Sequence, residues 1–234
     1  MTTLIKYIDL GLIEYNHAKV YQQKLFEENL EIKKQQRLNP EIDSNPTNNF
    51  LLLCTHPHVY TLGKSGSVNN LLVNEEFLKN KGATFYKTDR GGDITYHGPG
   101  QIVGYPILDL ESFSMGIKEY VYHLEKMIIE LLIAFNLHGE RLKNATGVWL
   151  DAEVPGKSRK ICAMGVKASR HITMHGFALN VNTDLDYFNY INPCGFTNKS
   201  VTSLEKETGI KQDIEFIKEK LKNSFEKVFD ARLI

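Results

Sequence analysis

The sequence has no long apolar run, no net charge and few cysteines. No window approaches the roughly 20 consecutive apolar residues that a membrane-spanning helix needs, and the first residues lack the basic-then-apolar pattern of a signal peptide. Lys and Arg together number 28, as do Asp and Glu, so the basic surplus typical of nucleic-acid-binding proteins is missing. We therefore expect a cytoplasmic protein whose main partner is neither a membrane nor nucleic acid.

The three cysteines, Cys54, Cys162 and Cys194, are too few and too scattered for a disulfide framework, and none belongs to a CxxC pair. Cys54 alternates with His56 and His58, but no second Cys/His pair completes four ligands at a recognisable spacing. We expect no metal and three free thiols. The question is then whether one of the thiols is reactive.

The 234 residues, 42% of them hydrophobic, are enough for one domain with a proper core, and we expect residues 1–234 to form it. Apolar residues recur at helical spacing in three segments. The first begins near Ala18 and runs to Arg37, the second begins at Ile117 and is expected to end at Gly139, and the third covers residues 214–228.

Strand-like segments lie between these helices. They are residues 50–54, 59–62, 84–87, 102–108, 147–150, 161–168 and 172–181. Because strands and helices mix without regular βαβ alternation, the pattern predicts an α+β fold, a mixed α/β domain with a central, largely antiparallel sheet. Residues 39–49 are rich in turn formers and are expected to be a surface loop inside the domain.

The densest cluster of unusual residues is the segment 90–101, RGGDITYHGPGQ. Four glycines and a proline allow sharp turns and let a ligand approach the main chain. The spacing matches neither the dinucleotide fingerprint nor the phosphate-binding loop of nucleotide hydrolases. A tight hairpin between residues 84–87 and 102–108 would explain the glycines alone, but the added Arg90, Thr95, Tyr96 and His97 favour a binding site.

A second cluster is Pro193-Cys194-Gly195, where an uncrowded thiol in a tight turn is a candidate nucleophile. A free cysteine is more often a small core residue, and the residues alone leave both readings open. An unperturbed thiol also needs help to lose its proton near neutral pH. His97, His175 and Lys160 are the candidates, and Lys160 stands where the chain enters an apolar run, although a solvated lysine is the plainer reading.

Taken together, the motifs resemble those of the octanoyltransferases of lipoate biosynthesis, the lipoyl(octanoyl) transferase family. The resemblance runs from about residue 16 to residue 204. It rests on six segments in the family's order: HPHVYTLG at 56–63, RGGDITYHGPGQ at 90–101, TGVW at 146–149, KICAMGV at 160–166, HGFALNV at 175–181 and INPCG at 191–195.

The resemblance implies the fold of the biotin and lipoate protein ligases and a two-step reaction. An octanoyl group passes from acyl carrier protein to the enzyme's cysteine, and then to a lysine of a lipoyl domain. It assigns the acyl-thioester to Cys194 and the lowering of that thiol's pKa to Lys160. The implied substrate contacts are Arg90, Gly91, Gly92, Asp93, Ile94, Thr95, Tyr96, His97, Ala163, Met164, Gly165, Gly176, Phe177 and Ala178.

The elementary chemistry agrees with this reading. Exchange between thioesters is nearly thermoneutral and conversion of a thioester to an amide runs downhill, so neither ATP nor another cofactor is needed. A lysine acceptor with a pKa near 10.4 is neutral in roughly one molecule in a few thousand at pH 7, so a base must take its proton. The eight-carbon chain needs a dry slot, for which Gly165, Gly176 and Ala178 leave room.

Three positions depart from the family's pattern. Cys162 stands where alanine is usual and is expected on the face of its strand opposite Lys160. Cys54 stands where Glu is common, and His58 replaces a second proline. None of them touches the predicted Cys194–Lys160 pair.

The implied partners are octanoyl-acyl carrier protein as donor, and the lipoyl domains of 2-oxoacid dehydrogenases and the H protein of glycine cleavage as acceptors; the enzyme is expected to be a monomer. Both partner types are typically acidic. A locally basic set is either a docking surface or an ordinary solvated loop. It comprises Lys143, Lys157, Arg159, Lys167 and Arg170. The alternatives to the transferase are an ATP-dependent lipoate ligase of the same fold and a non-catalytic docking module.

Overall fold

The computed structural model describes residues 2–39, 46–192 and 199–234. The large sheet has the strand order β12 (Ala231–Leu233), β1 (Thr3–Leu12), β2 (Phe50–Thr55), β6 (Gln101–Ile107), β10 (Ile172–Asn180), β9 (Arg159–Ser169), β8 (Ala145–Leu150) and β7 (Glu140–Leu142), with β11 (Ser200–Val201) paired to β9. Within it the successive pairs from β2 through β6, β10, β9 and β8 to β7 are antiparallel, whereas the pairs β12–β1, β1–β2 and β11–β9 are parallel. The predicted mixed, largely antiparallel sheet is confirmed.

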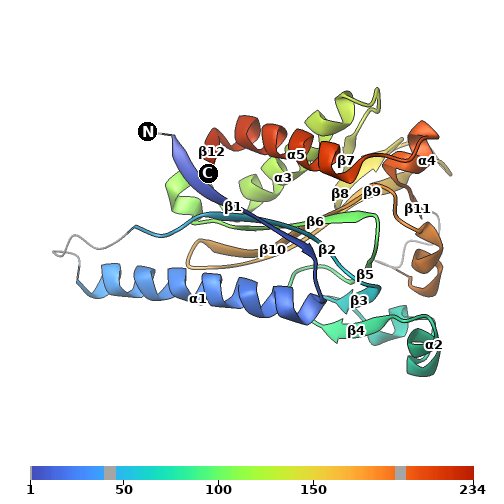
Figure 1. The fold of residues 1–234 in the computed structure, drawn as a ribbon, viewed down its shortest axis with the longest axis horizontal. Helices are drawn as coiled ribbons and strands as arrows, with labels where there is room; N and C mark the ends of the chain where they lie inside the picture. The colour runs from blue at the N-terminus through green and yellow to red at the C-terminus, as the bar shows by residue number, and fades with distance from the viewer. Residues whose placement is uncertain (1, 40–45, 193–198) are drawn as a thin grey trace.

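Helices cover both faces of this sheet (Figure 1). They are α1 (Tyr15–Leu38), α2 (Glu75–Asn80), α3 (Ile117–Ile133), α4 (Leu204–Thr208) and α5 (Ile214–Phe229), with the 3-10 turns η1 (Val68–Asn70), η2 (Leu110–Phe113) and η3 (Leu185–Tyr190). Figure 1 shows α1 on one side of the sheet and α3 with α5 on the other. The three predicted long helices are therefore confirmed.

Burial on both faces explains why β2 reads as an unbroken apolar run. Leu51 and Leu53 pack in the cluster that contains the buried residues of α3 and α5. Leu52 and Cys54 point the other way, into the cluster that contains Ala18 of α1. Successive residues of a strand face opposite sides, so a strand covered on both sides needs apolar residues at every position.

Helix α3 ends earlier than the sequence predicts. Its last residue is Ile133, and Asn136 adopts a positive φ of 56° shortly after it. Asn accepts the left-handed conformation at a helix end, so it turns the chain before Gly139 is reached. The prediction that the helix continues to Gly139 was wrong.

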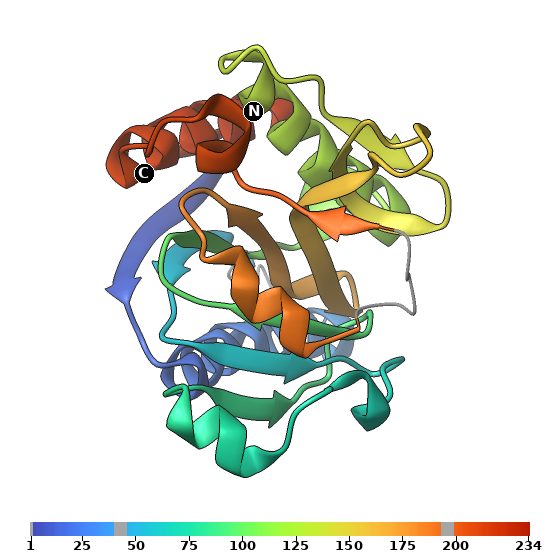
Figure 2. The ribbon, with the colours of Figure 1, turned by 90° about the vertical axis from the view of Figure 1, so that its right-hand side faces the viewer.

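A second, three-stranded sheet has the order β4 (Thr84–Lys87), β3 (Val59–Leu62), β5 (Ile94–His97) and lies beside the large one (Figure 2). Strand β5 lies inside the glycine-rich segment and pairs antiparallel with β3. The simple hairpin considered for residues 84–108 is therefore wrong: the turn at residues 98–100 joins strands of two different sheets.

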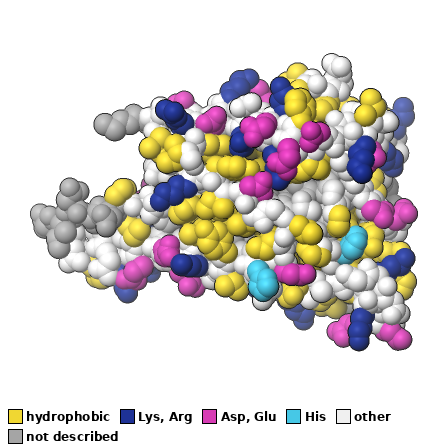
Figure 3. Space-filling model, viewed as in Figure 1, with side chains coloured by type: hydrophobic (Ala, Val, Ile, Leu, Met, Phe, Trp, Pro, Cys, Tyr) yellow, Lys and Arg dark blue, Asp and Glu magenta, His cyan; other side chains and the backbone are white. Residues whose placement is uncertain are grey.

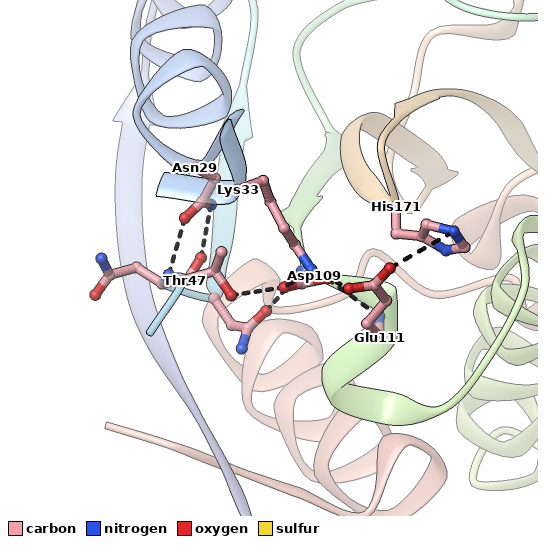
Figure 4. A network of polar contacts seen from close by, with 8 residues as sticks. Asn29, Lys33, Thr47, Asp109, Glu111 and His171 are labelled. Carbon is pink, nitrogen blue, oxygen red and sulfur yellow. Dashed lines mark hydrogen bonds and ion pairs between the residues drawn. The ribbon is translucent and has the colours of Figure 1, made fainter. Parts of the chain in front are cut away.

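A polar network fastens α1 to the turn that follows β6 (Figure 4). Lys33 of α1 lies 2.6 Å from the carboxylate of Asp109 and also contacts Glu111. Thr47 donates to Asp109 at 2.7 Å, and Asn29 exchanges two 2.8 Å hydrogen bonds with the backbone of Asn48. The C-terminal half of α1 is thus held on the end of the molecule far from β3 and β5.

Hydrophobic side chains also reach the surface between α1 and α5 (Figure 3). On this side β1 is an edge strand beyond its short pairing with β12, and Leu12 is 71% exposed. Asp9 interrupts the edge: it accepts a hydrogen bond from Gly11 N and pairs with Lys218 at 2.7 Å. A charged group on an open edge discourages pairing with a strand of another molecule.

Among the described residues, no helix is long and apolar enough to cross a membrane.

Candidate active site

A pocket of about 390 Å³ opens where the two sheets meet. Its walls come from β5, β6, β8, β9, β10 and β11, and most of its exposed lining is apolar. A volume of this size is in the range of about 300–1,000 Å³ that is typical of small-molecule sites. Of the predicted substrate contacts, those that line it are Arg90, Gly92, Asp93, Ile94, Thr95, His97, Ala163, Met164, Gly165, Gly176, Phe177 and Ala178.

Two predicted contacts lie elsewhere. Tyr96 points away from the pocket, stacks on Tyr187 at 5.0 Å and accepts or donates a 2.7 Å hydrogen bond with His58 Nδ1. Gly91 donates from its backbone N–H to the Val166 carbonyl at 2.9 Å, which ties the glycine-rich loop to β9. Both residues therefore hold the glycine-rich loop in place through contacts outside the pocket.

Lys160 lines the pocket from β9, directly opposite Trp149 of the neighbouring strand β8. Its ammonium group donates to the Thr146 carbonyl at 3.2 Å and lies 4.6 Å from the centroid of the Trp149 ring. Trp149 is 2% exposed. A backbone carbonyl and an aromatic face both attract a cation, so they hold the amine at a fixed place on the pocket wall.

A bulge in β9 separates Lys160 from Cys162. Val148 pairs with Cys162, whereas the next residue, Trp149, pairs with Lys160, so β9 contributes one extra residue here. Cys162 consequently packs in the hydrophobic core while Lys160 lines the pocket. The predicted opposite orientation is confirmed, and its cause is the bulge, because two residues apart in a regular strand would share a face.

Cys194, with Pro193 and Gly195, lies outside the described residues. The chain on either side is placed: Asn192 N donates to the Asn70 carbonyl at 2.8 Å, and Val201 of β11 pairs with Lys160. The described chain therefore resumes beside the predicted base.

Arg90 organises the glycine-rich loop. Its guanidinium donates to the Thr61 carbonyl at 2.6 Å, to the Asp93 carbonyl at 2.7 Å and to the Gly91 carbonyl at 3.0 Å. The loop passes so close to the end of β3 that a Cβ on Gly63 would come 2.2 Å from the Gly92 carbonyl oxygen. Glycine is needed where two backbones approach in this way.

Gly176 is small for a similar reason. A Cβ at this position would lie 2.2 Å from the Gly104 carbonyl oxygen on the adjacent strand β6. The close packing of β10 on β6 thus requires glycine at this position. The space in the pocket wall is a consequence of this packing.

His97 is buried at the pocket floor and is held in one tautomer. Its Nδ1 lies 2.8 Å from Gln101 Oε1, and Gln101 Nε2 in turn donates to Asn180 Oδ1 at 2.9 Å. Because Gln101 Oε1 can only accept, His97 carries its proton on Nδ1 and presents Nε2 as an acceptor toward Thr61. Burial, together with the nearby His56, lowers the pKa of His97 to about 3. His97 is therefore a neutral hydrogen-bond group at pH 7.

The depressed pKa of His97 predicts a pH-dependent stability. Below pH about 6.5 the His97 imidazole is protonated in the unfolded chain but stays neutral in the folded chain. The free energy of unfolding therefore falls with falling pH by up to about 1.4 kcal/mol per pH unit. His97→Asn is expected to make the free energy of unfolding less dependent on pH between 7 and 5, measured by urea titration. His56 and His175, whose pKa values burial also lowers, should keep the remaining slope in the same direction.

The exposed His138 offers a matched control. His138→Asn should leave the slope of the wild-type protein unchanged. An equal slope in His97→Asn and wild-type protein would contradict a neutral, buried His97.

A carboxylate that the sequence did not single out contacts a residue of the pocket wall. Asp89 lies 2.8 Å from Nε2 of the pocket residue His175 and 2.5 Å from the ammonium group of Lys167. The hydrogen bond from His175 and the pair with Lys167 hold the pKa of Asp89 well below its usual range. Its position just before Arg90 was the available signal. Asp89 orients the ring of His175.

The predicted basic set does not form one patch. Arg159 pairs with Glu207 at 2.6 Å and also contacts Asp151, while Lys167 pairs with Asp89. Lys157 precedes β9 and Arg170 follows it, and an eleven-residue strand separates them by roughly 35 Å. Of the two readings left open, separate solvated or paired residues fit this arrangement.

The side chains of the Cys54–His56–His58 alternation form hydrogen bonds within the protein. The Nδ1 of His56 forms a 2.7 Å hydrogen bond with the Ile13 carbonyl, and its Nε2 forms a 2.7 Å hydrogen bond with the Tyr105 hydroxyl. His58 faces Tyr96. Within the described part of the chain, no group of three His, Cys, Asp or Glu side chains is placed to hold a metal ion.

Comparison with known proteins places this site in a family. The model of the lipoyl protein ligase A/B catalytic domain matches residues 27–226. The chain belongs to this family. Among the curated relatives of this chain, an octanoyltransferase of Parabacteroides distasonis is 54% identical, with 96% of this chain and 98% of the relative covered. An octanoyltransferase of Flavobacterium psychrophilum is 53% identical over the whole of both chains.

Solved structures agree on the fold. A bi-partite lipoate protein ligase from Thermoplasma acidophilum has a TM-score of 0.69 at 13% identity, covering 99% of this chain and 88% of that one. A lipoate-protein ligase A bound with ATP has a TM-score of 0.66 at 14% identity, covering 100% of this chain and 90% of that one. The predicted lipoate ligase fold is confirmed.

Proposed function

We propose that this chain is an octanoyltransferase of protein lipoylation, which moves an octanoyl group from octanoyl-acyl carrier protein to a specific lysine of lipoyl domains. The observation that carries the proposal is Lys160, held by Thr146 and Trp149 on the wall of a mostly apolar pocket. It is supported by relatives named octanoyltransferases that are more than 50% identical over at least 96% of the chain.

In the first step the Cys194 thiolate attacks the thioester carbonyl of the donor. A new C–S bond forms, the donor's C–S bond breaks, and the departing thiolate takes a proton from the Lys160 ammonium. The enzyme is then an octanoyl thioester and Lys160 is a neutral amine. One cationic group favours the thiolate before attack and supplies the proton that the leaving group needs.

In the second step the acceptor lysine attacks the thioester of Cys194. A C–N bond forms, the C–S bond breaks, and the proton lost by the attacking amine goes to the neutral Lys160. The enzyme returns to the state of a Cys194 thiolate beside a Lys160 ammonium. No nucleotide takes part, because each step exchanges an acyl group between carriers of equal or decreasing energy.

The pocket suits a short alkyl chain. Val103, Phe177 and Ala178 are at most 3% exposed and supply an apolar wall, and each methylene buried there contributes about 0.8 kcal/mol. The Arg90 loop lies at the polar end, where it can orient the acyl carbonyl, and His97 Nε2, which is an acceptor, can orient the attacking amine. We further propose cytoplasmic location, a monomer, and the lipoyl domains of 2-oxoacid dehydrogenases and the glycine-cleavage H protein as acceptors.

The test is a transfer assay without ATP. The purified protein is mixed with octanoyl-acyl carrier protein and an unmodified lipoyl domain, and the mass of the lipoyl domain is followed. We expect it to gain one octanoyl group at least about 100-fold faster than in the enzyme-free control. A gain that requires free octanoate and ATP would show a ligase, and no gain under either condition would leave a docking module.

A further inference from the structure

A second lysine stands beside the predicted base. The ammonium nitrogen of Lys199 lies 5.3 Å from the centroid of the Trp149 ring, and that of Lys160 lies 4.6 Å from the same centroid. Both side chains line the pocket. Two cations therefore share the surroundings of one indole ring.

The strand pairing explains how the two lysines meet. At Lys160, β9 pairs with Trp149 of β8 on one side and with Val201 of β11 on the other. Residues paired across strands share a face, and so do residues two apart in an extended chain. Lys199, two residues before Val201, thus starts on the pocket side and reaches across β9 to Trp149, passing over the strand that carries Lys160.

We propose that Lys199 is a positioning residue for this site, whose positive charge lowers the pKa of Lys160 and increases the fraction of the neutral amine. The inference rests on the proposed function of Lys160 as the base that receives the acceptor's proton. A second cationic group beside a catalytic lysine is an established way to activate its amine.

The other charged and titratable groups around the site act with or against this effect. Arg90 lines the pocket and acts in the same direction as Lys199. Asp93, whose carboxylate accepts from Asn70 at 2.6 Å, opposes it. Behind β8, Glu125 opposes it too, although it is paired with Arg141 at 3.0 Å and bonded to Gly147 N. His97 and His175 line the pocket, and burial lowers the pKa of each.

Trp149 and Thr146 also favour the charged form of Lys160, since both interact with its ammonium group. These groups remain when Lys199 is replaced, so the difference between wild-type and variant isolates the effect of the Lys199 charge. At the separation of about 10 Å or less that this geometry allows, and with an effective dielectric of about 20, that effect is about one pH unit.

The test measures the pKa of Lys160 directly, without substrate. The folded protein is labelled briefly with trace acetic anhydride at a series of pH values, and acetylation of Lys160 is quantified by peptide mass spectrometry. In Lys199→Met, which keeps an aliphatic chain over the ring, we expect the midpoint for Lys160 to rise by about one unit. Lys199→Arg should keep the wild-type midpoint because it keeps the charge.

Two controls separate charge from structure. Lys118→Met removes an exposed lysine at the start of α3 and should leave the midpoint unchanged. Raising the salt to about 1 M shortens the screening length to about 3 Å and should shrink the difference between Lys199→Met and wild-type protein. An unchanged midpoint in Lys199→Met, or a shift that salt does not affect, would overturn the proposal.

The outcome is independent of the transfer assay. Labelling of Lys160 needs neither a donor nor Cys194, so a shifted midpoint with no octanoyl transfer would reject the proposed function alone. Transfer with an unshifted midpoint would reject only the role of Lys199.

Discussion

Replacing Cys194 with serine is expected to abolish the covalent octanoyl adduct and to lower the transfer rate by about 1,000-fold or more. A hydroxyl is too weak an acid for a nearby lysine to ionise it near neutral pH, so the first step stops. The measurement is the mass of the intact protein after incubation with octanoyl-acyl carrier protein alone. The wild-type protein should gain one octanoyl group and the variant none.

Cys162 provides the matched control for this experiment. It lies in the hydrophobic core, and burial raises the pKa of its thiol well above the ordinary value. Cys54 is buried likewise, and desolvation raises its pKa. Cys162→Ala should therefore still form the adduct. Turnover in Cys194→Ser at the wild-type rate, or an adduct that disappears in Cys162→Ala, would contradict the assignment.

Replacing Lys160 with methionine should lower kcat/KM by about 1,000-fold, because one amine both favours the thiolate and accepts the proton of the attacking lysine. Methionine keeps the aliphatic chain against Trp149, so the pocket wall should survive the change. The variant's Cys194 should also react more slowly with iodoacetamide at pH 7, since the thiolate loses its cationic neighbour. Steady-state transfer and thiol alkylation together report the two roles.

The exposed Lys143, at the turn between β7 and β8, supplies the control for lost charge. Lys143→Met should stay within about twofold of wild-type activity. A Lys160→Met protein that folds and retains transfer within about threefold of wild type would remove Lys160 from the mechanism.

The sequence pattern predicted the helices and strands that are determined by residues close together in the sequence. Strands β3 and β4 match their predicted bounds, and the helical spacing of α3 and α5 reflects one apolar face on the sheet. Strand β1 was missed because its exposed edge and the Asp9 and Gly11 positions interrupt any alternation. Strand β5 was missed because the flanking glycines read as one loop, and only its pairing with β3 makes it extended.

In the site, too, local sequence predicted some features, whereas others depend on contacts between distant strands. The glycine-rich segment and the residues around Lys160 form continuous motifs, so sequence alone singled them out. Lys199 carries no motif of its own. Trp149 ends the TGVW segment, but its contact with Lys160 comes from strand pairing that brings three distant segments beside one amine. The bulge that turns Cys162 into the core is also invisible in a single strand, because it exists only relative to β8.

The two ends of the chain meet at one edge of the large sheet, where β12 pairs in parallel with β1 and Tyr7 N donates to the Ile234 carbonyl at 2.9 Å. Strand β1 therefore cannot form its outer hydrogen bonds until β12, which lies far along the chain, is in place. Contacts of such long sequence separation slow folding, and until then a growing chain on the ribosome exposes an unpaired strand. The large sheet is therefore completed only when residues 231–233 have reached β1.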